Sequence, residues 1–301
     1  MNLWIQGMRR SGTTILFDAL GEDPELRCFY EPLREQDVTE GGGSGARAGD
    51  AFAETRELRE RFRDREFPEL PIEQFNWGGP RDPAAELESD LPDHCRAWLA
   101  SLLEEGANVA IKETRLHHKV DAVGEVDPSA AFVHLVRDPR AVAASTLLGR
   151  RRRFDLYPDA DAFFELSTDR KLWSSRAISE RLADRGEIPG LAEDSPDVAR
   201  PLAVWRAAFE ATDAAGRRAF GDRYALLRLE DLSLDPDREV HRIYERLDRP
   251  APEEVLAWAR RNVRRTEDVH LGDDARWDET MQALGMEPAL EAAGYDASLS
   301  L

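Results

Sequence analysis

The stretch Gly7-Met-Arg-Arg-Ser-Gly-Thr-Thr14 follows a short apolar segment, residues 2–6 (NLWIQ), and leads into a helical pattern over residues 13–20. Glycines let a backbone fold tightly against an anion, and the N-terminus of the following helix presents N–H groups to it. The order strand, glycine loop, helix therefore predicts a phosphate-binding loop in an α/β protein. A tight turn with solvated arginines is the alternative, but it does not explain why residues 11–14 open a helix.

The end of this loop differs from that of Mg²⁺-dependent nucleotide triphosphatases. Those enzymes need lysine and then serine or threonine after the last glycine. Here Gly12 is followed by Thr13, and the basic residues Arg9 and Arg10 come earlier. The loop therefore favours phosphate binding without a conventional kinase mechanism. A P-loop kinase acting on a small molecule stays an alternative, with Asp138 as its Mg²⁺ carboxylate.

Strand-like and helix-like segments alternate along the rest of the chain. Further strands are expected at residues 26–30, 108–112, 130–136 and 224–229, and helices at 93–105, 139–148, 160–184 and 198–219. Alternation of this kind predicts a P-loop-containing three-layer α/β/α fold with a mainly parallel central sheet. We expect a single domain over residues 1–301. Residues 36–92 lack a clean period and are expected to form an insertion of loops and short helices that shapes the acceptor pocket.

Composition restricts the partners and the compartment. The chain has 301 residues, is 42% hydrophobic and carries a formal net charge of −19. This composition is globular, and its charge repels nucleic acid and anionic membranes. The apolar runs are too short to span a membrane, and no leader precedes the first strand, so we expect a cytoplasmic protein. The oligomeric state is left open.

The acidic surface has two explanations. Lysine occurs only at positions 112, 119 and 171, against 60 Asp and Glu residues. A salt-loving host explains this pattern and predicts loss of the fold at low salt, and an arginine-rich coding bias explains it as well. Cys28 and Cys95 form no CxxC pair, which predicts two buried free thiols and no cysteine metal site.

A second basic position follows the strand at residues 130–136. Arg137 ends this strand, and parallel sheets bind ligands beyond the carboxyl ends of their strands. Ser145 follows on the next predicted helix, so the two residues could bind a second phosphate. Spacing alone favours simpler roles, with Arg137 capping the sheet edge and Ser145 packing as a small residue.

Together these segments resemble the PAPS-dependent sulfotransferases, PAPS being 3′-phosphoadenosine 5′-phosphosulfate. RRSGTTILFDAL (9–20) is similar to their 5′-phosphosulfate loop, and LVRDPRAVAAS (135–145) to their 3′-phosphate motif. LRLEDLSLDP (227–236) resembles the family's late strand and acidic turn, and MEPALEAAGYD (286–296) resembles its C-terminal helix. The matches follow the family's order and cover somewhat under a third of the chain.

The resemblance implies a role for each motif residue. The 5′-phosphosulfate would be held by Arg9, Arg10, Ser11, Gly12, Thr13 and Thr14, with Arg10 in the place of the loop cation. Arg137 and Ser145 would hold the 3′-phosphate. Lys112 resembles the lysine that many members direct at the transferred group.

The catalytic base is implied by a separate segment. RCFYEPLR (27–34) resembles the carbohydrate and protein-tyrosine branches, which place a glutamate after the second strand, so Glu31 is the candidate base. Cytosolic small-molecule members have a histidine where this chain has Thr114. His117 and His118 are out of register and are interpreted as polar helix residues. The alternative for Glu31 is a salt bridge to a loop arginine.

These assignments predict transfer of a sulfuryl group from PAPS to a hydroxyl acceptor, namely a carbohydrate, a glycolipid or a small-molecule metabolite. Glu31 would remove the hydroxyl proton during in-line attack, and Arg10 and Lys112 would stabilise the departing PAP, with no metal required. A catalytically inactive nucleotide-binding protein of the same fold is the second alternative.

Two segments are harder to interpret. The family's C-terminal adenosine clamp is absent, and Trp277 is more simply a core residue than a base-stacking one. Attraction of an anionic acceptor is one interpretation of the basic run at residues 150–153, and a solvated helix face is the simpler one.

Overall fold

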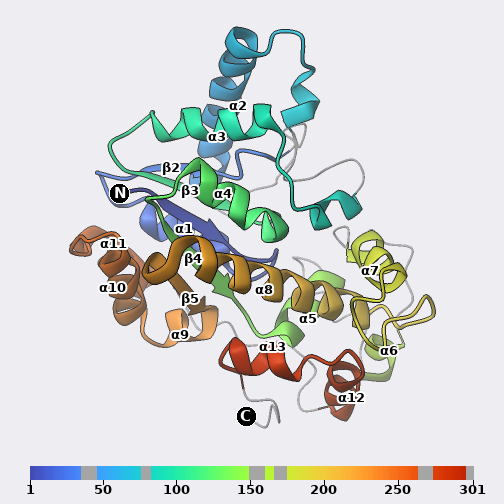
Figure 1. Ribbon diagram of the computed structural model, residues 1–301. Helices are drawn as coiled ribbons and strands as arrows, with labels where there is room; N and C mark the ends of the chain where they lie inside the picture. The colour runs from blue at the N-terminus through green and yellow to red at the C-terminus, as the bar shows by residue number, and fades with distance from the viewer. Residues whose placement is uncertain (35–45, 76–82, 149–159, 166–174, 264–273, 296–301) are drawn as a thin grey trace. The chain divides into compact units, whose positions relative to one another are not determined.

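A central sheet of five parallel strands organises the chain (Figure 1). The computed structural model describes residues 1–34, 46–75, 83–148, 160–165, 175–263 and 274–295. The strands are β1 (Leu3–Gln6), β2 (Arg27–Tyr30), β3 (Val109–Glu113), β4 (Ala131–Val136) and β5 (Tyr224–Arg228), in the order β2-β3-β1-β4-β5. β1 lies in the middle, and the chain leaves it first toward β2 and later toward β4. The carboxyl ends of all five strands therefore meet at one edge, with a topological switch point beside β1.

Two hydrophobic cores lie on the two faces of this sheet. Alternate residues of a strand point to opposite faces. Leu3 and Ile5 pack with α1 (Thr13–Leu20), α10 and α11, whereas Trp4 packs with α3 and α4. The remaining bounds are α3 (Asp93–Leu103), α4 (Val120–Val126), α10 (Pro236–Arg246) and α11 (Glu253–Asn262). These helices cover the sheet as two outer layers (Figure 1), which confirms the three-layer α/β/α prediction.

The other elements connect and extend these layers. They are α2 (Ala46–Glu66), η1 (Ile72–Phe75), η2 (Pro83–Leu87), η3 (His117–Lys119), α5 (Pro139–Leu148), α6 (Ala160–Phe164), α7 (Ser175–Asp184), α8 (Ala199–Phe220), η5 (Gly221–Arg223), α9 (Leu229–Leu234), α12 (Ala275–Ala283) and α13 (Glu287–Ala292). The expectation of only loops and short helices in residues 36–92 is wrong, because α2 has 21 residues. The expected helix over 160–184 corresponds to α6 and α7, with residues 166–174 outside the described residues.

The chain divides into two units by its internal contacts. Unit 1 contains Met1–Val136 and Thr212–Arg265, and unit 2 contains Arg137–Ala211 and Thr266–Leu301. Unit 1 holds the sheet and both cores. The single domain expected over residues 1–301, with an acceptor-specificity region at 36–92, stays a prediction.

Trp277 belongs to the interior of unit 2. Its side chain is 1% exposed and packs against the rings of Phe163 and Phe164, with centroids 5.7 and 5.0 Å away. The interpretation of Trp277 as a core residue is therefore confirmed. Of the two free thiols, Cys95 is buried but Cys28 is partly exposed, which corrects half of the expectation for the cysteines.

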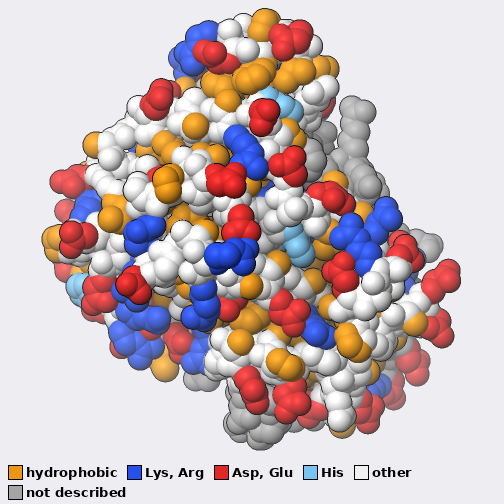
Figure 2. Space-filling model, viewed as in Figure 1, with side chains coloured by type: hydrophobic (Ala, Val, Ile, Leu, Met, Phe, Trp, Pro, Cys, Tyr) orange, Lys and Arg blue, Asp and Glu red, His pale blue; other side chains and the backbone are white. Residues whose placement is uncertain are grey.

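Charged side chains of both signs are interspersed over the face of the molecule shown in Figure 2. Among the helices of the described residues, none combines the length and the apolar character that crossing a membrane requires. The basic run at residues 150–153 lies outside the described residues.

Candidate active site

The glycine loop, residues 7–14, joins β1 to α1 and has the backbone of a tight anion-binding turn. A Cβ on Gly7 would lie 2.4 Å from the carbonyl oxygen of Leu135, so only glycine fits against β4 here. Gly12 has a φ of 88° and Arg10 a φ of 78°, both in the left-handed region. Arg10 carries a side chain, and such a backbone is held only where the surroundings enforce it.

The residues after Gly12 present polar groups at the N-terminus of α1. The first amides of a helix have no partner inside the helix, and α1 has no side-chain cap. Ser11 is 1% exposed, and among the described residues its Oγ has no hydrogen-bond partner. Thr13 is buried beside it. A buried hydroxyl without a partner at a helix N-terminus suits an anionic ligand.

Glu31 and Lys112 form a buried ion pair at the ends of β2 and β3. Glu31 Oε1 accepts from Lys112 Nζ and, at 3.4 Å, from Thr114 Oγ1. Glu31 Oε2 accepts from Arg34 Nη1 at 3.1 Å. Lys112 is 1% exposed, and its ammonium lies 4.1 Å from the centre of the Tyr30 ring. Among the described residues, the ion pairs of Glu31 are with Lys112 and with Arg34 of its own turn, and not with an arginine of the glycine loop.

Tyr30 links this ion pair to the glycine loop. Its hydroxyl shares a hydrogen bond of 2.8 Å with Thr14 Oγ1, while the face of its ring receives the Lys112 ammonium. The register supports this arrangement, since Tyr30 lies beside Lys112 in the β2–β3 pair. The loop and the Glu31–Lys112 pair therefore belong to one connected site within unit 1.

The ion pair sets the protonation states. Burial alone would raise the pKa of Glu31, but the positive charges of Lys112 and Arg34 outweigh burial and lower it. Burial alone would lower the pKa of Lys112. The negative charge of the Glu31 carboxylate outweighs burial, and the pKa of Lys112 is therefore raised. Both groups are charged near neutral pH.

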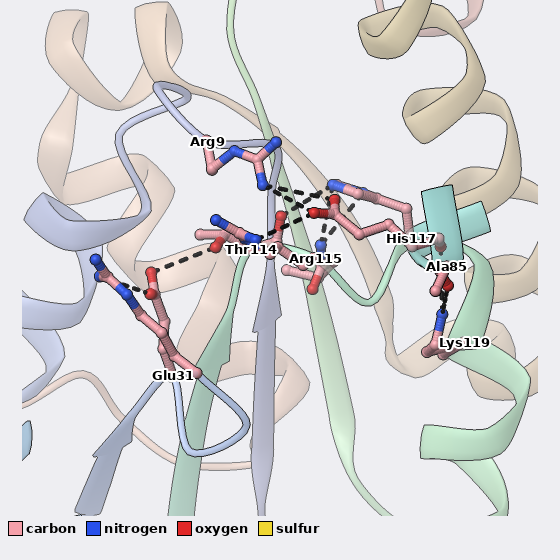
Figure 3. Close-up of polar contacts among 10 residues, drawn as sticks. Arg9, Glu31, Ala85, Thr114, Arg115, His117 and Lys119 are labelled. Atoms are coloured by element: carbon pink, nitrogen blue, oxygen red, sulfur yellow. Dashed lines mark hydrogen bonds and ion pairs between the residues drawn. The ribbon is translucent and has the colours of Figure 1, made fainter. Parts of the chain in front are cut away.

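A second acidic residue connects two arginines beside the loop. Glu86 of η2 accepts from Arg9 Nη1 at 3.2 Å and from Arg115 Nη1 at 3.2 Å. Figure 3 labels both arginines, together with Glu31 and Lys119, beyond the ends of the strands. Burial first, and then the charge of Arg9, lower the pKa of Arg115 to about 10. η2 is anchored by Lys119, whose buried Nζ donates to the carbonyl of Ala85 at 3.1 Å and to two more carbonyls of this segment.

Basic side chains outnumber acidic ones at this edge of the sheet, although the whole chain carries −19. The ion-paired acidic residues are Glu31 and Glu86, and their bonded partners are Arg9, Arg34, Lys112 and Arg115. Arg10 adds a further cation in the loop. Low-dielectric surroundings strengthen such charges, so the site can bind and stabilise an anionic group.

The two histidines after β3 lie in the 3-10 helix η3, in agreement with the expectation of helix residues, but His117 is buried. His117 is buried, lies within 3.1 Å of both Thr212 Oγ1 and the carbonyl of Thr114, and contacts Gln6. Burial holds its pKa well below the ordinary value. His117 is thus a buried neutral histidine beneath the site, whereas His118 is half-buried. Neither takes the register position of Thr114.

Arg137 and Ser145 lie in unit 2, each half-buried. The carbonyl of Arg137 accepts from Trp205 Nε1 at 3.0 Å. Asp138 caps α5 by accepting from the backbone N–H of Arg140 at 2.8 Å, and the Arg140 guanidinium binds the same carboxylate. The carboxylate considered for Mg²⁺ in a kinase is therefore held by an arginine. No group of three or more potential metal-ligating residues is found among the described residues.

Sequence analysis missed several members of the site. Arg34 was contained in the quoted segment 27–34 but received no role. Glu113 directly follows Lys112 and ends β3, and Arg115 lies two residues beyond that end. That position is a usable signal, because such strand ends face the ligand crevice. Glu86 had no local signal at all.

The comparisons with known proteins agree on the class. A sequence model of the sulfotransferase family matches residues 3–189, so the chain belongs to the sulfotransferase family. The sulfotransferase domain of the Synechococcus PCC 7002 olefin synthase has a similar structure, with a TM-score of 0.50 and 17% identity over 98% of this chain and 95% of that one. The sulfotransferase domain of the curacin biosynthetic pathway has a TM-score of 0.50 and 14% identity over 98% and 97%. Similarity at this level shows the fold alone. No curated protein sequence matches the chain significantly.

Proposed function

We propose that this protein transfers a sulfuryl group from PAPS to a hydroxyl acceptor and that Glu31 is the base. The observation that carries the proposal is the connection, through Thr14 and Tyr30, between the glycine loop and the buried Glu31–Lys112 pair. An anion site after β1 and a carboxylate after β2, with Lys112 on β3 between them, are what transfer from a phosphosulfate to a hydroxyl requires.

The loop residues suit the 5′-phosphosulfate of the donor. The backbone amides of the loop and the Ser11 hydroxyl, which has no hydrogen-bond partner among the residues that the structure describes, would bind the phosphate, with Thr13 and Thr14 beside them. Arg9 and Arg10 would supply the neighbouring positive charge. Arg137 and Ser145 are assigned to the 3′-phosphate by the resemblance.

Glu31 and Lys112 would separate when the donor binds. Lys112 gains a second anionic partner in the sulfuryl group, so its hold on Glu31 weakens and the pKa of Glu31 rises toward that of a useful base. The acceptor oxygen then attacks sulfur in line as its proton passes to Glu31. The sulfur–oxygen bond to the phosphate breaks, and PAP leaves with the electron pair, stabilised by Arg10, Lys112 and the loop amides.

Ligand-dependent stability tests the donor. A ligand that binds only the folded state stabilises it by about 2.7 kcal/mol at a hundredfold excess over its dissociation constant. Thermal unfolding at high KCl is measured with PAP, with ADP, which lacks the 3′-phosphate, and with Mg-ATP. We expect PAP to raise the melting temperature and the other two to have little effect. Stabilisation by Mg-ATP and not by PAP would refute the donor assignment and favour the kinase alternative.

Turnover tests the reaction itself. PAPS with a radiolabelled sulfuryl group is incubated with a hexose, N-acetylglucosamine, a hydroxy acid or a phenol, and label in the acceptor is measured. Transfer to one of these acceptors supports the proposal and identifies the acceptor class. Binding of PAP without conversion of PAPS to PAP in any mixture would instead support an inactive nucleotide-binding protein.

A further inference from the structure

The segment that carries Glu31 is a strained turn, residues 31–34 (the Glu31 turn). Glu31 has a φ of 44°, a left-handed backbone that a residue with a side chain keeps only when its surroundings hold it. The backbone N–H of Glu31 donates to the carbonyl of Lys112 at 2.7 Å, and that of Arg34 donates to the carbonyl of Glu31 at 3.0 Å. The turn is therefore attached to β3 at its first residue and closed on itself at its last.

Three buried side chains bind the rest of the turn's backbone. They come from β3, α3 and α2, three elements distant in sequence from the turn. Their bonds are Leu33 N to Glu113 Oε1 (2.9 Å), Trp98 Nε1 to Pro32 O (3.2 Å) and Arg59 Nη1 to Arg34 O (3.1 Å). Because each of these side chains is at most 3% exposed, the turn is held by fixed groups.

Of these three side chains, that of Glu113 comes from β3, the strand that pairs with β2 and so runs beside Glu31. Glu113 follows Lys112 on β3, and consecutive strand residues point to opposite faces. Lys112 binds the Glu31 carboxylate on one face, and Glu113 binds the turn's backbone on the other. The end of β3 therefore fixes both the side chain and the backbone of the Glu31 turn.

The Glu113 carboxyl is built for this contact and not for an ion pair. It is 1% exposed, and among the described residues its Oε2 has no hydrogen-bond partner. Burial first, and then the negative charge of Glu31, raise the pKa of Glu113 to about 8. The ionisable groups that face it are Glu31, Lys112, Arg59 and Cys95. At neutral pH Glu113 is a neutral acid whose Oε1 accepts from Leu33.

We propose that Glu113 is a positioning residue for the reaction: it holds the Glu31 turn in its strained conformation and so aims the Glu31 carboxylate at the acceptor hydroxyl. Glu113 does not touch the reacting atoms in this role. The inference rests on the proposed function, in which Glu31 is the base. A misplacement of a catalytic group by about 1 Å reduces the rate about a hundredfold.

The test compares two substitutions at this position. Glu113→Gln keeps an oxygen acceptor for the Leu33 N–H and, like the protonated acid, has no charge. Glu113→Leu has a similar size but no acceptor. Glu239→Gln is the matched control, since Glu239 is a buried carboxylate on α10 paired with Arg242 and has no contact with the turn. The rate measured is conversion of PAPS to PAP in water, per folded molecule, together with PAP-induced stabilisation and hydrogen exchange of the Leu33 amide.

We expect Glu113→Leu to lower the rate about a hundredfold while PAP still stabilises the variant as it does the wild type. Its Leu33 amide exchanges about tenfold faster or more, because that N–H has lost its acceptor. Glu113→Gln restores both the rate and the protection of Leu33, and Glu239→Gln keeps the wild-type rate.

Unchanged rate and unchanged Leu33 exchange in Glu113→Leu would overturn the proposal, as would a Glu113→Gln variant as slow as Glu113→Leu. A wild type that neither binds PAP nor converts PAPS signals failure of the proposed function instead. In that case the Leu33 exchange of the two variants still decides whether Glu113 holds the turn.

Discussion

The glycine loop and the Glu31 turn lie at the same edge of the sheet, on either side of the end of β3, but are built in different ways. The loop is formed by consecutive residues whose backbone conformation and amides make the anion site. The turn is held by side chains from α2, α3 and β3, up to 81 residues away in sequence and all buried. The first design depends on local conformation, whereas the second depends on the packing of the whole sheet edge. Substitutions in the glycine loop should therefore weaken ligand binding more than they lower stability. Substitutions in the Glu31 turn should lower stability more than they weaken ligand binding.

The largest effect is expected from Glu31→Gln. It leaves the Lys112 ammonium buried with no carboxylate, and removal of one partner of a buried ion pair costs about 3–5 kcal/mol of unfolding free energy. Turnover should be lost while PAP binding persists. Chemical denaturation and PAP-induced stabilisation are the measurements.

The control for this prediction is the double variant Glu31→Gln with Lys112→Met. It removes both charges and should recover most of the lost stability without recovering turnover. Wild-type turnover in Glu31→Gln would remove Glu31 from the role of base, and wild-type stability would show that Lys112 tolerates the loss of its partner.

A pH series on the Glu31 turn should give the next largest effect. Folding raises the pKa of Glu113 from 4.5 to about 8, so the folded protein keeps a proton that the unfolded chain releases. Between these values the free energy of unfolding falls as pH rises, in total on the order of a few kcal/mol. Glu113→Gln lacks this dependence. The free energy of unfolding of the wild type should therefore fall steadily relative to that of Glu113→Gln when both are measured from pH 4 to about 9. A difference that stays constant over this range would contradict the raised pKa of Glu113.

Gly12→Ala should affect binding more than stability. Placing alanine at φ 88° costs about 1–2 kcal/mol. Gly186→Ala is the matched control, because Gly186 has φ 65° and open space around its Cβ position. Both variants should lose stability in thermal unfolding, and Gly12→Ala should lose somewhat more, because its Cβ would also lie 2.7 Å from Leu229 Cδ1. Only Gly12→Ala should lose the PAP-induced rise in melting temperature. Equal PAP responses in the two variants would remove Gly12 from the anion site.

The smallest effect is expected at Glu86. Its carboxylate competes with a bound anion for the guanidiniums of Arg9 and Arg115. Glu86 is buried, but the side chains of Arg9 and Arg115 remain 12% and 18% exposed and the glutamine keeps an oxygen acceptor, so Glu86→Gln should cost on the order of 1 kcal/mol. PAP should bind a few-fold more tightly, as titration calorimetry would measure. Weaker binding would mean that Glu86 orients Arg9 for the donor.

The same contrast explains what could be predicted from the sequence. The expected strands at 108–112 and 130–136 correspond to β3 and β4, because buried parallel strands are continuous apolar runs. The conformation of residues 7–14 could also be predicted from the sequence, since glycine positions and the following helix are local signals. α2 was missed because its few core-facing apolar residues, such as Leu58 and Phe62, lie among many charges and leave a weak period.

The set of residues that form the site was harder to predict from the sequence, for the same physical reason. The resemblance indicated Glu31 and Lys112, and the structure brings them together. The bridge from Glu86 to Arg9 joins residues 77 positions apart, and the bond from Glu113 to Leu33 joins residues 80 apart. Such contacts depend on how layers pack, and no single sequence window contains them.

The cationic edge of the sheet has a kinetic consequence, because it is embedded in a chain of net charge −19. A donor with several negative charges is repelled by the molecule at long range and attracted only within the site itself. Salt shortens the reach of both forces, to about 10 Å at 0.1 M, and so removes the distant repulsion before the close attraction. Electrostatically steered association ordinarily slows as salt is added. For this protein the capture of an anionic donor should become faster with the first additions of salt, an inverted dependence that stopped-flow mixing would reveal.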